Sequence, residues 1–299
     1  MSTTSAPGQP KTGAEGRAIG AAARGRSFAP FSNAPAYMVA LALGAVVIVP
    51  IAYVALSGFR TTGQLAFDPV GLPNPWVTHN YTNVLTSEAF WRQLGNSVII
   101  AAVATTLVVG ISALAAYPLS RFEFRGREAI YTFFTFGLLF PIAVAALPLY
   151  LLLRQLGLDD TLLGVALPEA AFGIPITIII LRPFMRQIPS ELEDAAAIDG
   201  CTSFGFFWRV LLPLTRPALM TVIILQVIYS WNNFILPLLV LTDPNHWTLP
   251  LGVANYSTEH SADTAGILAF TTVSMVPALV FFLAAERRIV GGLSGAVKG

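Results

Sequence analysis

The sequence predicts an all-α integral membrane protein. Hydrophobic residues make up 55% of the 299 positions and charged residues only 11%, and the mean hydropathy is +0.69. A soluble domain carries about 25% charged residues, so this composition excludes an ordinary soluble fold. Six apolar segments are each long enough to cross a bilayer as a helix, which takes about 20 residues. The segments do not alternate apolar and polar residues as membrane-barrel strands do, and helices satisfy their own backbone groups in lipid.

The six predicted membrane helices form a domain over residues 36–285. They occupy residues 36–59, 94–118, 129–153, 163–181, 218–241 and 264–285. The first is long enough to span, so we expect an uncleaved helix and not a signal peptide. Residues 1–35 are rich in Ala, Gly, Ser and Pro, which is typical of a disordered basic tail. Residues 286–299 are expected to form a C-terminal tail.

The basic residues predict how the helices are oriented. Lys and Arg favour the cytoplasmic side of membrane proteins. Fourteen of the 17 lie before the first helix, between the second and third, between the fourth and fifth, or after the sixth, and only Arg60, Arg92 and Arg154 lie opposite. We therefore expect both termini and the 190–217 insert to be cytoplasmic.

That insert, between the fourth and fifth predicted helices, is polar and helix-forming. Ser190 followed by Glu193 matches a capping box, which predicts the start of a helix. Gly200 is typical of a left-handed helix stop, and Thr202 or Ser203 would cap a second helix. An apolar stripe at helical spacing accompanies the first helix: Leu192, Ala195, Ala196 and Ile198. The pattern predicts two short helices hinged at Gly200.

The insert resembles the EAA loop of ABC importer permeases. That motif reads Glu-Ala-Ala, three residues, Gly, nine residues, Ile, one residue, Leu-Pro. The matching residues here are Asp194, Ala195, Ala196, Gly200, Val210, Leu212 and Pro213, with Asp194 in place of the Glu and Val210 in place of the Ile. The resemblance implies that these short cytoplasmic helices couple the chain to a partner ATPase. The coupling residues would be Glu193, Asp194, Ala195, Ala196, Asp199 and Gly200.

The C-terminal end carries a second resemblance. Its sequence GGLSGAVKG is similar to the ending of carbohydrate-group permeases of the maltose type, and RFEFRGRE at residues 121–128 resembles the family's second cytoplasmic loop. Such tails reach into the ATPase dimer interface, which would place Val297 and Lys298 there. The resemblance covers nearly all of the chain after residue 35 and favours a carbohydrate as the transported solute.

The implied function is ATP-driven import of a sugar or oligosaccharide by alternating access, in a bacterial-type cytoplasmic membrane. The implied partners are a second permease subunit, an ABC ATPase dimer, an extracytoplasmic substrate-binding protein and membrane lipid. Lys11 and Lys298 are the only lysines, and neither lies in a Gly-rich phosphate loop, so ATP and Mg are expected on the partner and this chain is expected to be non-catalytic. We expect no metal site, because His79, His246 and His260 are isolated in the sequence. A net charge of +1 gives no indication of nucleic-acid binding.

Polar residues inside the predicted spans are candidates for the substrate pathway. Glu169 is the one acid clearly within a span, where a charge is costly, so it would line the pathway or contact a neighbouring helix. Aromatic rings and amides suited to a sugar lie together in the fifth span, or form contacts between helices: Tyr229, Trp231, Asn232 and Asn233.

Other functions remain open at this point. An ABC permease for a solute other than a sugar would share the insert. An ion-coupled secondary transporter would be expected to carry several ionisable residues within its spans and often inverted repeats, but the sequence shows one acid and no evident repeat. A membrane-embedded enzyme would need an acid–base or metal cluster. The second permease would be a different subunit or another copy of this one.

Overall fold

The computed structural model describes residues 34–257 and 262–296, with side chains described up to residue 285. The regular elements of this part of the chain are helices, and an isolated antiparallel bridge joins Ser257 to Ala262. The all-α prediction is therefore confirmed for the described residues. The chain divides into two units, Met1–Pro50 and Ile51–Gly299.

Four helices are long and apolar enough to cross a membrane, and six spans result if two sharply bent helix pairs each count as one. The four are α1 (Ala34–Ser57), α4 (Glu88–Arg121), α7 (Leu162–Gln187) and α14 (Thr264–Ala296). Of the predicted tails, residues 1–33 and 297–299 lie outside the described residues. Because α14 continues to Ala296, most of the predicted C-terminal tail is helical.

One bent pair corresponds to the third predicted helix, and the other joins the end of the 190–217 insert to the first part of the fifth predicted helix. The segment predicted as one helix at 129–153 forms α5 (Arg127–Gly137) and α6 (Ile142–Gln155), which meet at 95°. Pro141 is the N-cap of α6, and since proline lacks an N–H it cannot continue the ladder of α5. The segment predicted as the third span is therefore helical on both sides of Pro141 and sharply bent there.

The fifth predicted helix is also divided. It forms α11 (Arg216–Trp231) and α12 (Ile235–Val240), separated at Asn232-Asn233-Phe234. Before it, a helical segment from Ser203 to Leu214 meets α11 at 75°. That segment consists of α9 (Ser203–Phe206), a π-helical stretch η1 (Phe207–Leu211) and α10 (Leu212–Leu214).

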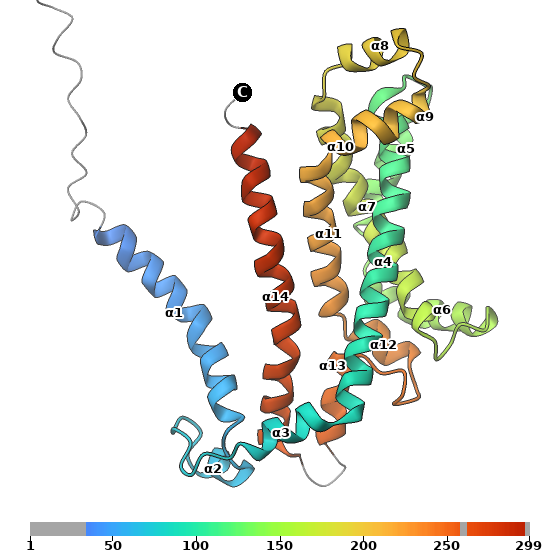
Figure 1. Cartoon of the computed structure of the whole chain (residues 1–299). Coiled ribbons are helices and arrows are strands. Elements are labelled where there is room, and N and C mark those ends of the chain that lie inside the picture. Colours follow the sequence, from blue (N-terminus) through green and yellow to red (C-terminus); the bar gives the residue numbers. More distant parts are fainter. Residues whose placement is uncertain (1–33, 258–261, 297–299) are drawn as a thin grey trace, which may run out of the picture. The chain divides into compact units, whose positions relative to one another are not determined.

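In the unit Ile51–Gly299, α4 packs along α7 and α11, and α14 packs against α11 (Figure 1). Small buried residues of α4, including Ala104, Ala113 and Ala116, let the neighbouring helices approach closely. The hydroxyl of Ser112 donates to the carbonyl of Ile174 on α7 over 3.4 Å. These contacts make α4 the central helix of the bundle.

The short helices lie at the two ends of this bundle (Figure 1). At one end are α8 (Glu191–Ile198), α9 and α10, which belong to the 190–217 insert. Toward the other end lie α2 (Thr62–Phe67), α3 (His79–Thr86), α12, α13 (Leu249–Gly252) and the 3-10 turn η2 (Val253–Tyr256).

Candidate functional site

The 190–217 insert forms a helical hairpin-like loop whose turn is made by Gly200. The Gly200 backbone has φ +78°, a left-handed conformation that side chains with a Cβ disfavour. The N–H of Cys201 donates to the carbonyl of Ala196 at 2.8 Å, and that of Gly200 to Ala197 at 3.0 Å. This bond pair is the Schellman motif, so the predicted stop of the first short helix is confirmed. Thr202 caps α9 by accepting from the N–H of Gly205.

The predicted capping box at the start of α8 is absent. Ser190 is the N-cap residue, but its side chain makes no capping hydrogen bond. Glu193, the other half of the expected box, faces Arg121 at the end of α4, with 4.0 Å between Glu193 Oε2 and Arg121 Nε. The prediction of a helix start is confirmed, while its expected capping contact is wrong because a distant arginine competes for the carboxylate.

The residues of α8 divide between two faces. Glu193 and Ala196 are partly buried, and Ala196 packs with Cys201 against a buried cluster built from α4, α7, the α9–η1 segment and α11. The opposite face is exposed and carries both apolar and acidic side chains: Leu192, Asp194, Ala195, Ile198 and Asp199. The side chain of Ile198 is 86% exposed. Three of the four residues of the predicted apolar stripe therefore face away from the protein's own core.

Two aromatic residues of the loop extend this exposed surface. Phe204 on α9 is 65% exposed and Trp208 on η1 is half exposed, and their rings lie 6.1 Å apart in an edge-to-face arrangement. The sequence analysis did not select them, because aromatic residues beside an apolar span look like part of that span. We call the exposed residues Leu192, Asp194, Ala195, Ile198, Asp199, Phe204 and Trp208 the outer loop face.

Within the bundle, Glu169 on α7 is fully buried and hydrogen-bonded to the break between α11 and α12. Its Oε1 accepts a hydrogen bond from the amide of Asn233 at 2.9 Å, while Oε2 has no hydrogen-bond partner among the described residues. The sequence left two roles open for Glu169, lining the pathway or contacting a neighbouring helix. The structure shows the contact with a neighbouring helical segment. Asn233 also accepts at its Oδ1 from the N–H of Leu236, the second residue of α12.

The remaining pathway candidates face different spaces. Trp231 and Asn232 line a cavity of about 630 Å³ between α4, α11, α13 and α14, whose other lining is largely apolar. Tyr229 lines a smaller cavity of about 170 Å³ between α7 and α11, together with Gln226. The structure therefore does not bring Glu169, Tyr229, Trp231, Asn232 and Asn233 together in a single pocket.

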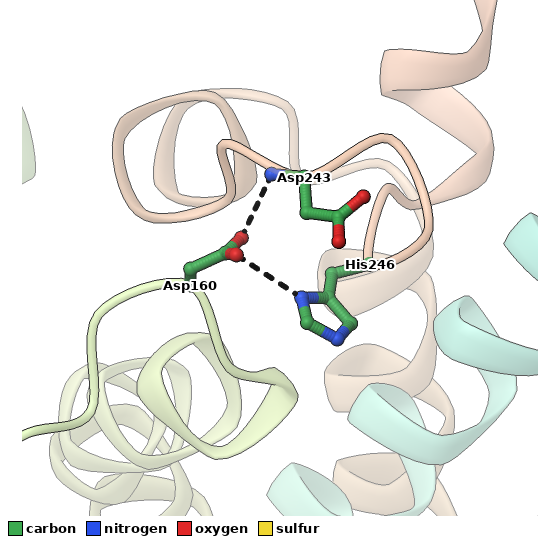
Figure 2. A group of neighbouring side chains, drawn as sticks. All are labelled: Asp160, Asp243 and His246. Carbon is green, nitrogen blue, oxygen red and sulfur yellow. Dashed lines mark hydrogen bonds and ion pairs between the residues drawn. The ribbon is translucent and has the colours of Figure 1, made fainter.

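At the other end of the bundle, Asp160 joins two loops (Figure 2). Its Oδ1 accepts from the backbone N–H groups of Thr242 and Asp243, and its Oδ2 lies 3.3 Å from Nδ1 of His246. Burial alone would raise the pKa of Asp160, but these backbone hydrogen bonds and His246 outweigh it and hold the pKa below its ordinary value. His246 is isolated in the sequence but not in space.

In the described part of the chain, Asp160, Asp243 and His246 are the residues that could hold a metal ion, since their ligand atoms lie within 4.8 Å of one another. Asp160 directs one oxygen to backbone amides and the other to the imidazole (Figure 2). The arrangement acts as a tether between the α6–α7 and α12–α13 loops, because the side-chain hydrogen bonds and the ion pair of Asp160 cross between them.

A bundle of apolar helices with a short helical loop exposed at one end is the arrangement of a multi-pass membrane protein. The chain belongs to the family described as "Binding-protein-dependent transport system inner membrane component", whose model matches residues 108–290. The family indicated by the 190–217 insert is thereby confirmed, and it is a transport component and not a family of enzymes.

Named relatives cover most of the chain. It is 36% identical over 92% of its length to the diacetylchitobiose uptake system permease protein NgcG of Streptomyces coelicolor, 90% of which is covered. It is 34% identical over 85% of its length to the arabinooligosaccharides transport system permease protein AraQ of Halalkalibacterium halodurans, 92% of which is covered. Its fold matches a chain of a bacterial ABC transporter involved in the import of alginate, with a TM-score of 0.74, 22% identity, and coverage of 88% of this chain and 97% of that one.

Val297 and Lys298, the predicted tail residues for the ATPase interface, lie outside the described residues. So does His260.

Proposed function

We propose that this chain is the permease subunit of an ATP-driven importer that carries a sugar or oligosaccharide inward by alternating access. Relatives named for diacetylchitobiose, arabinooligosaccharides and trehalose support a carbohydrate as the solute. The partners are a second permease subunit, an ABC ATPase dimer and an extracytoplasmic binding protein. A fold relative captured in complex with a pentasaccharide-bound periplasmic protein supports the last of these. Six spans follow if each bent helix pair counts as one, and the bias of the basic residues supports a cytoplasmic position for both termini and the 190–217 insert.

The observation that carries this proposal is the outer loop face. An isolated helix of eight residues is marginal in water, and α8 turns its apolar stripe outward, where only a partner can cover it. Asp194 and Asp199 add negative charge beside that stripe, suited to basic groups on the ATPase. We therefore assign α8 as the docking helix, with Ala195 small enough for close approach to the ATPase and Ala196 small enough to pack closely on the loop's own core.

Coupling follows from how the loop is attached. Ala196 and Cys201 pack on the same buried cluster as residues of α4, α7 and α11. Since a packed core transmits displacement and does not absorb it, movement of the ATPase would carry these helices together. ATP and Mg act on the partner, and this chain converts their movement into opening of the pathway.

The solute pathway is assigned to the surfaces of α4, α7, α11 and α14 that line the two cavities. Trp231 and Tyr229 offer ring faces on which a sugar stacks, and Asn232 offers an amide for its hydroxyl groups. Glu169 and Asn233 support this surface from behind, because their polar groups bond to each other. The apolar lining suits one face of a sugar ring, so the partner permease would supply most of the remaining polar contacts.

Co-purification tests the docking assignment. We would compare the native tagged chain with Ile198→Asp for retention of an ABC ATPase. The substituted side chain is exposed, so folding is expected to be unchanged while an apolar contact is replaced by a desolvated charge. Phe67→Asp is the matched control, since Phe67 is 94% exposed on α2 at the other end of the bundle.

We expect the native chain and Phe67→Asp to retain the ATPase and Ile198→Asp to lose it. Retention by all three would reject the outer loop face as the docking surface. Solute uptake in membrane vesicles then separates the remaining alternatives. Uptake that survives an inactive ATPase but stops when ion gradients are collapsed would establish secondary transport. Uptake measured with a panel of oligosaccharides, amino acids and polyamines identifies the class of solute.

A further inference from the structure

A polar contact beneath the docking helix ties both halves of the insert to α4. Arg121 lies in the last turn of α4 and faces Glu193 in the first turn of α8. One turn earlier on α4, the hydroxyl of Tyr117 donates to the backbone carbonyl of Ser203 on α9 at 2.9 Å. We call these four residues the α4 brace. It holds the loop on both sides of the Gly200 turn.

Charge and burial make Arg121 the central member of the brace. Its side chain is only 6% exposed, against 27% for Glu193. Its Nε and one terminal nitrogen have no hydrogen-bond acceptor among the described residues, and Glu193 is the carboxylate facing them. A buried guanidinium without acceptors is unfavourable, so a small inward movement of α8 that shortens the contact would be stabilised.

The helix ends reinforce this pairing. A cation in the last turn of α4 and an anion in the first turn of α8 are each favoured by the dipole of their own helix. Each charge is therefore stabilised at its own helix end independently of the contact between Arg121 and Glu193. The pair then fixes how α8 is placed on α4.

The same end of α4 is also tied to α7. The Nε of Arg182 donates to the carbonyl of Leu119 at 2.9 Å, and the Arg182 side chain, 5% exposed, also pairs with Glu128 at the start of α5. Consequently the docking helix and the ends of α4 and α7 are connected by side-chain contacts in addition to the chain itself.

We propose that Arg121 is a positioning residue that locks the docking helix to α4, so that force from the ATPase enters the bundle through α4 and not only through the flanking α7 and α11. This inference rests on the proposed function. It also divides the acidic residues of the insert between two tasks: Glu193 faces inward to the brace, while Asp194 and Asp199 face the partner.

The test uses the complete transporter reconstituted in lipid vesicles and measures solute molecules moved per ATP hydrolysed. The variants are Arg121→Ala, Arg121→Glu, Glu193→Arg and the double reversal Arg121→Glu/Glu193→Arg. Arg125→Ala is the control, because Arg125 lies on the neighbouring turn, is exposed and forms no ion pair among the described residues. We expect each single variant to retain the ATPase, since the outer loop face is intact, but to transport less solute per ATP, because breaking the pair leaves a largely buried charge without its partner.

A second readout follows the loop directly. Cys201 is the only cysteine of the chain and is partly buried against the loop's core cluster. Its rate of reaction with a thiol reagent therefore reports opening of the loop. On the full-length chain in lipid, we expect Arg121→Ala to raise that rate about fivefold through local opening, and the double reversal to return it toward the native rate.

The outcomes separate the brace from the proposed function. Native thiol reactivity and native coupling in Arg121→Ala, or a double reversal no better than the single variants, would overturn the brace. Absence of any ATPase from the native complex would reject the proposed function, while a raised Cys201 rate in Arg121→Ala would still establish that Arg121 holds the loop.

Discussion

The left-handed turn at Gly200 allows docking to be tested separately from folding. Its φ of +78° disfavours any residue with a Cβ, and a Cβ built there meets no atom within 4 Å. Gly200→Ala therefore adds backbone strain without a steric clash. That strain is about 1–2 kcal/mol for a left-handed non-glycine residue. If the free variant relaxes out of the turn and docking restores it, the apparent affinity for the ATPase falls by a factor of about 5–30, because that strain energy must be supplied on binding.

Gly157 provides the matched control. It has φ +68° and an equally open surrounding, but it lies between α6 and α7, toward the end of the bundle opposite α8. Gly157→Ala should carry the same strain without weakening the ATPase contact. The assay is titration of the purified ATPase against the permease in nanodiscs, with thermal unfolding of each variant measured in parallel.

Equal affinity losses in the two variants would refute the reasoning, since the effect would then come from general destabilisation. An unchanged affinity in Gly200→Ala would refute it as well, because the turn would then not be part of the docked conformation.

Three further predictions concern the bundle and its opposite end. Asn233→Leu removes the hydrogen-bond donor to the buried Glu169, so we expect the stability to fall by about 1–3 kcal/mol, measured as a lower unfolding temperature. Adding Glu169→Leu in the same chain should largely restore that temperature, and no recovery would show that the two side chains act independently. Gly173→Ala places a methyl group 2.4 Å from the Gln226 side chain, so overpacking should cost about 1–3 kcal/mol in thermal unfolding, and a stability equal to the native chain would contradict this packing. Because the pKa of Asp160 is depressed in the folded state, its tether adds to the folding stability above the unfolded carboxyl pKa of about 3.9. That stability is lost as the pH falls through the lower folded pKa. The free energy of unfolding measured against pH should show this dependence in the native chain and not in Asp160→Asn.

The docking loop shows how far sequence reasoning reaches. Gly200 was predicted as a helix stop because left-handed backbone is available chiefly to glycine, and a Schellman motif forms there. The helix start at Ser190 was predicted from the same kind of local pattern. Its capping partner was not, since Glu193 pairs with Arg121 across the fold. Phe204 and Trp208 were missed because exposure of an aromatic ring depends on neighbours that the local sequence does not reveal.

The pathway candidates show the same division. Glu169 stood out because an acid within an apolar run is costly wherever it lies. Its bond to Asn233, and the placing of Trp231 and Tyr229 in different cavities, depend on how α11 is rotated against α7 and α14. The rotation of a helix about its own axis is set by packing against its neighbours. The sequence alone could therefore group these residues only by their proximity along the chain.

By itself the sequence determined an all-helical membrane chain, the location of its apolar segments and the presence of two short helices around Gly200. These properties follow from composition, segment length and local backbone preference, which act within a few residues. Only the tertiary structure decided which face of α8 turns outward, that Glu193 faces Arg121, and that Asp160 meets His246. Each of these depends on contacts between residues distant in sequence, and the energy of such contacts exists only once the helices have packed.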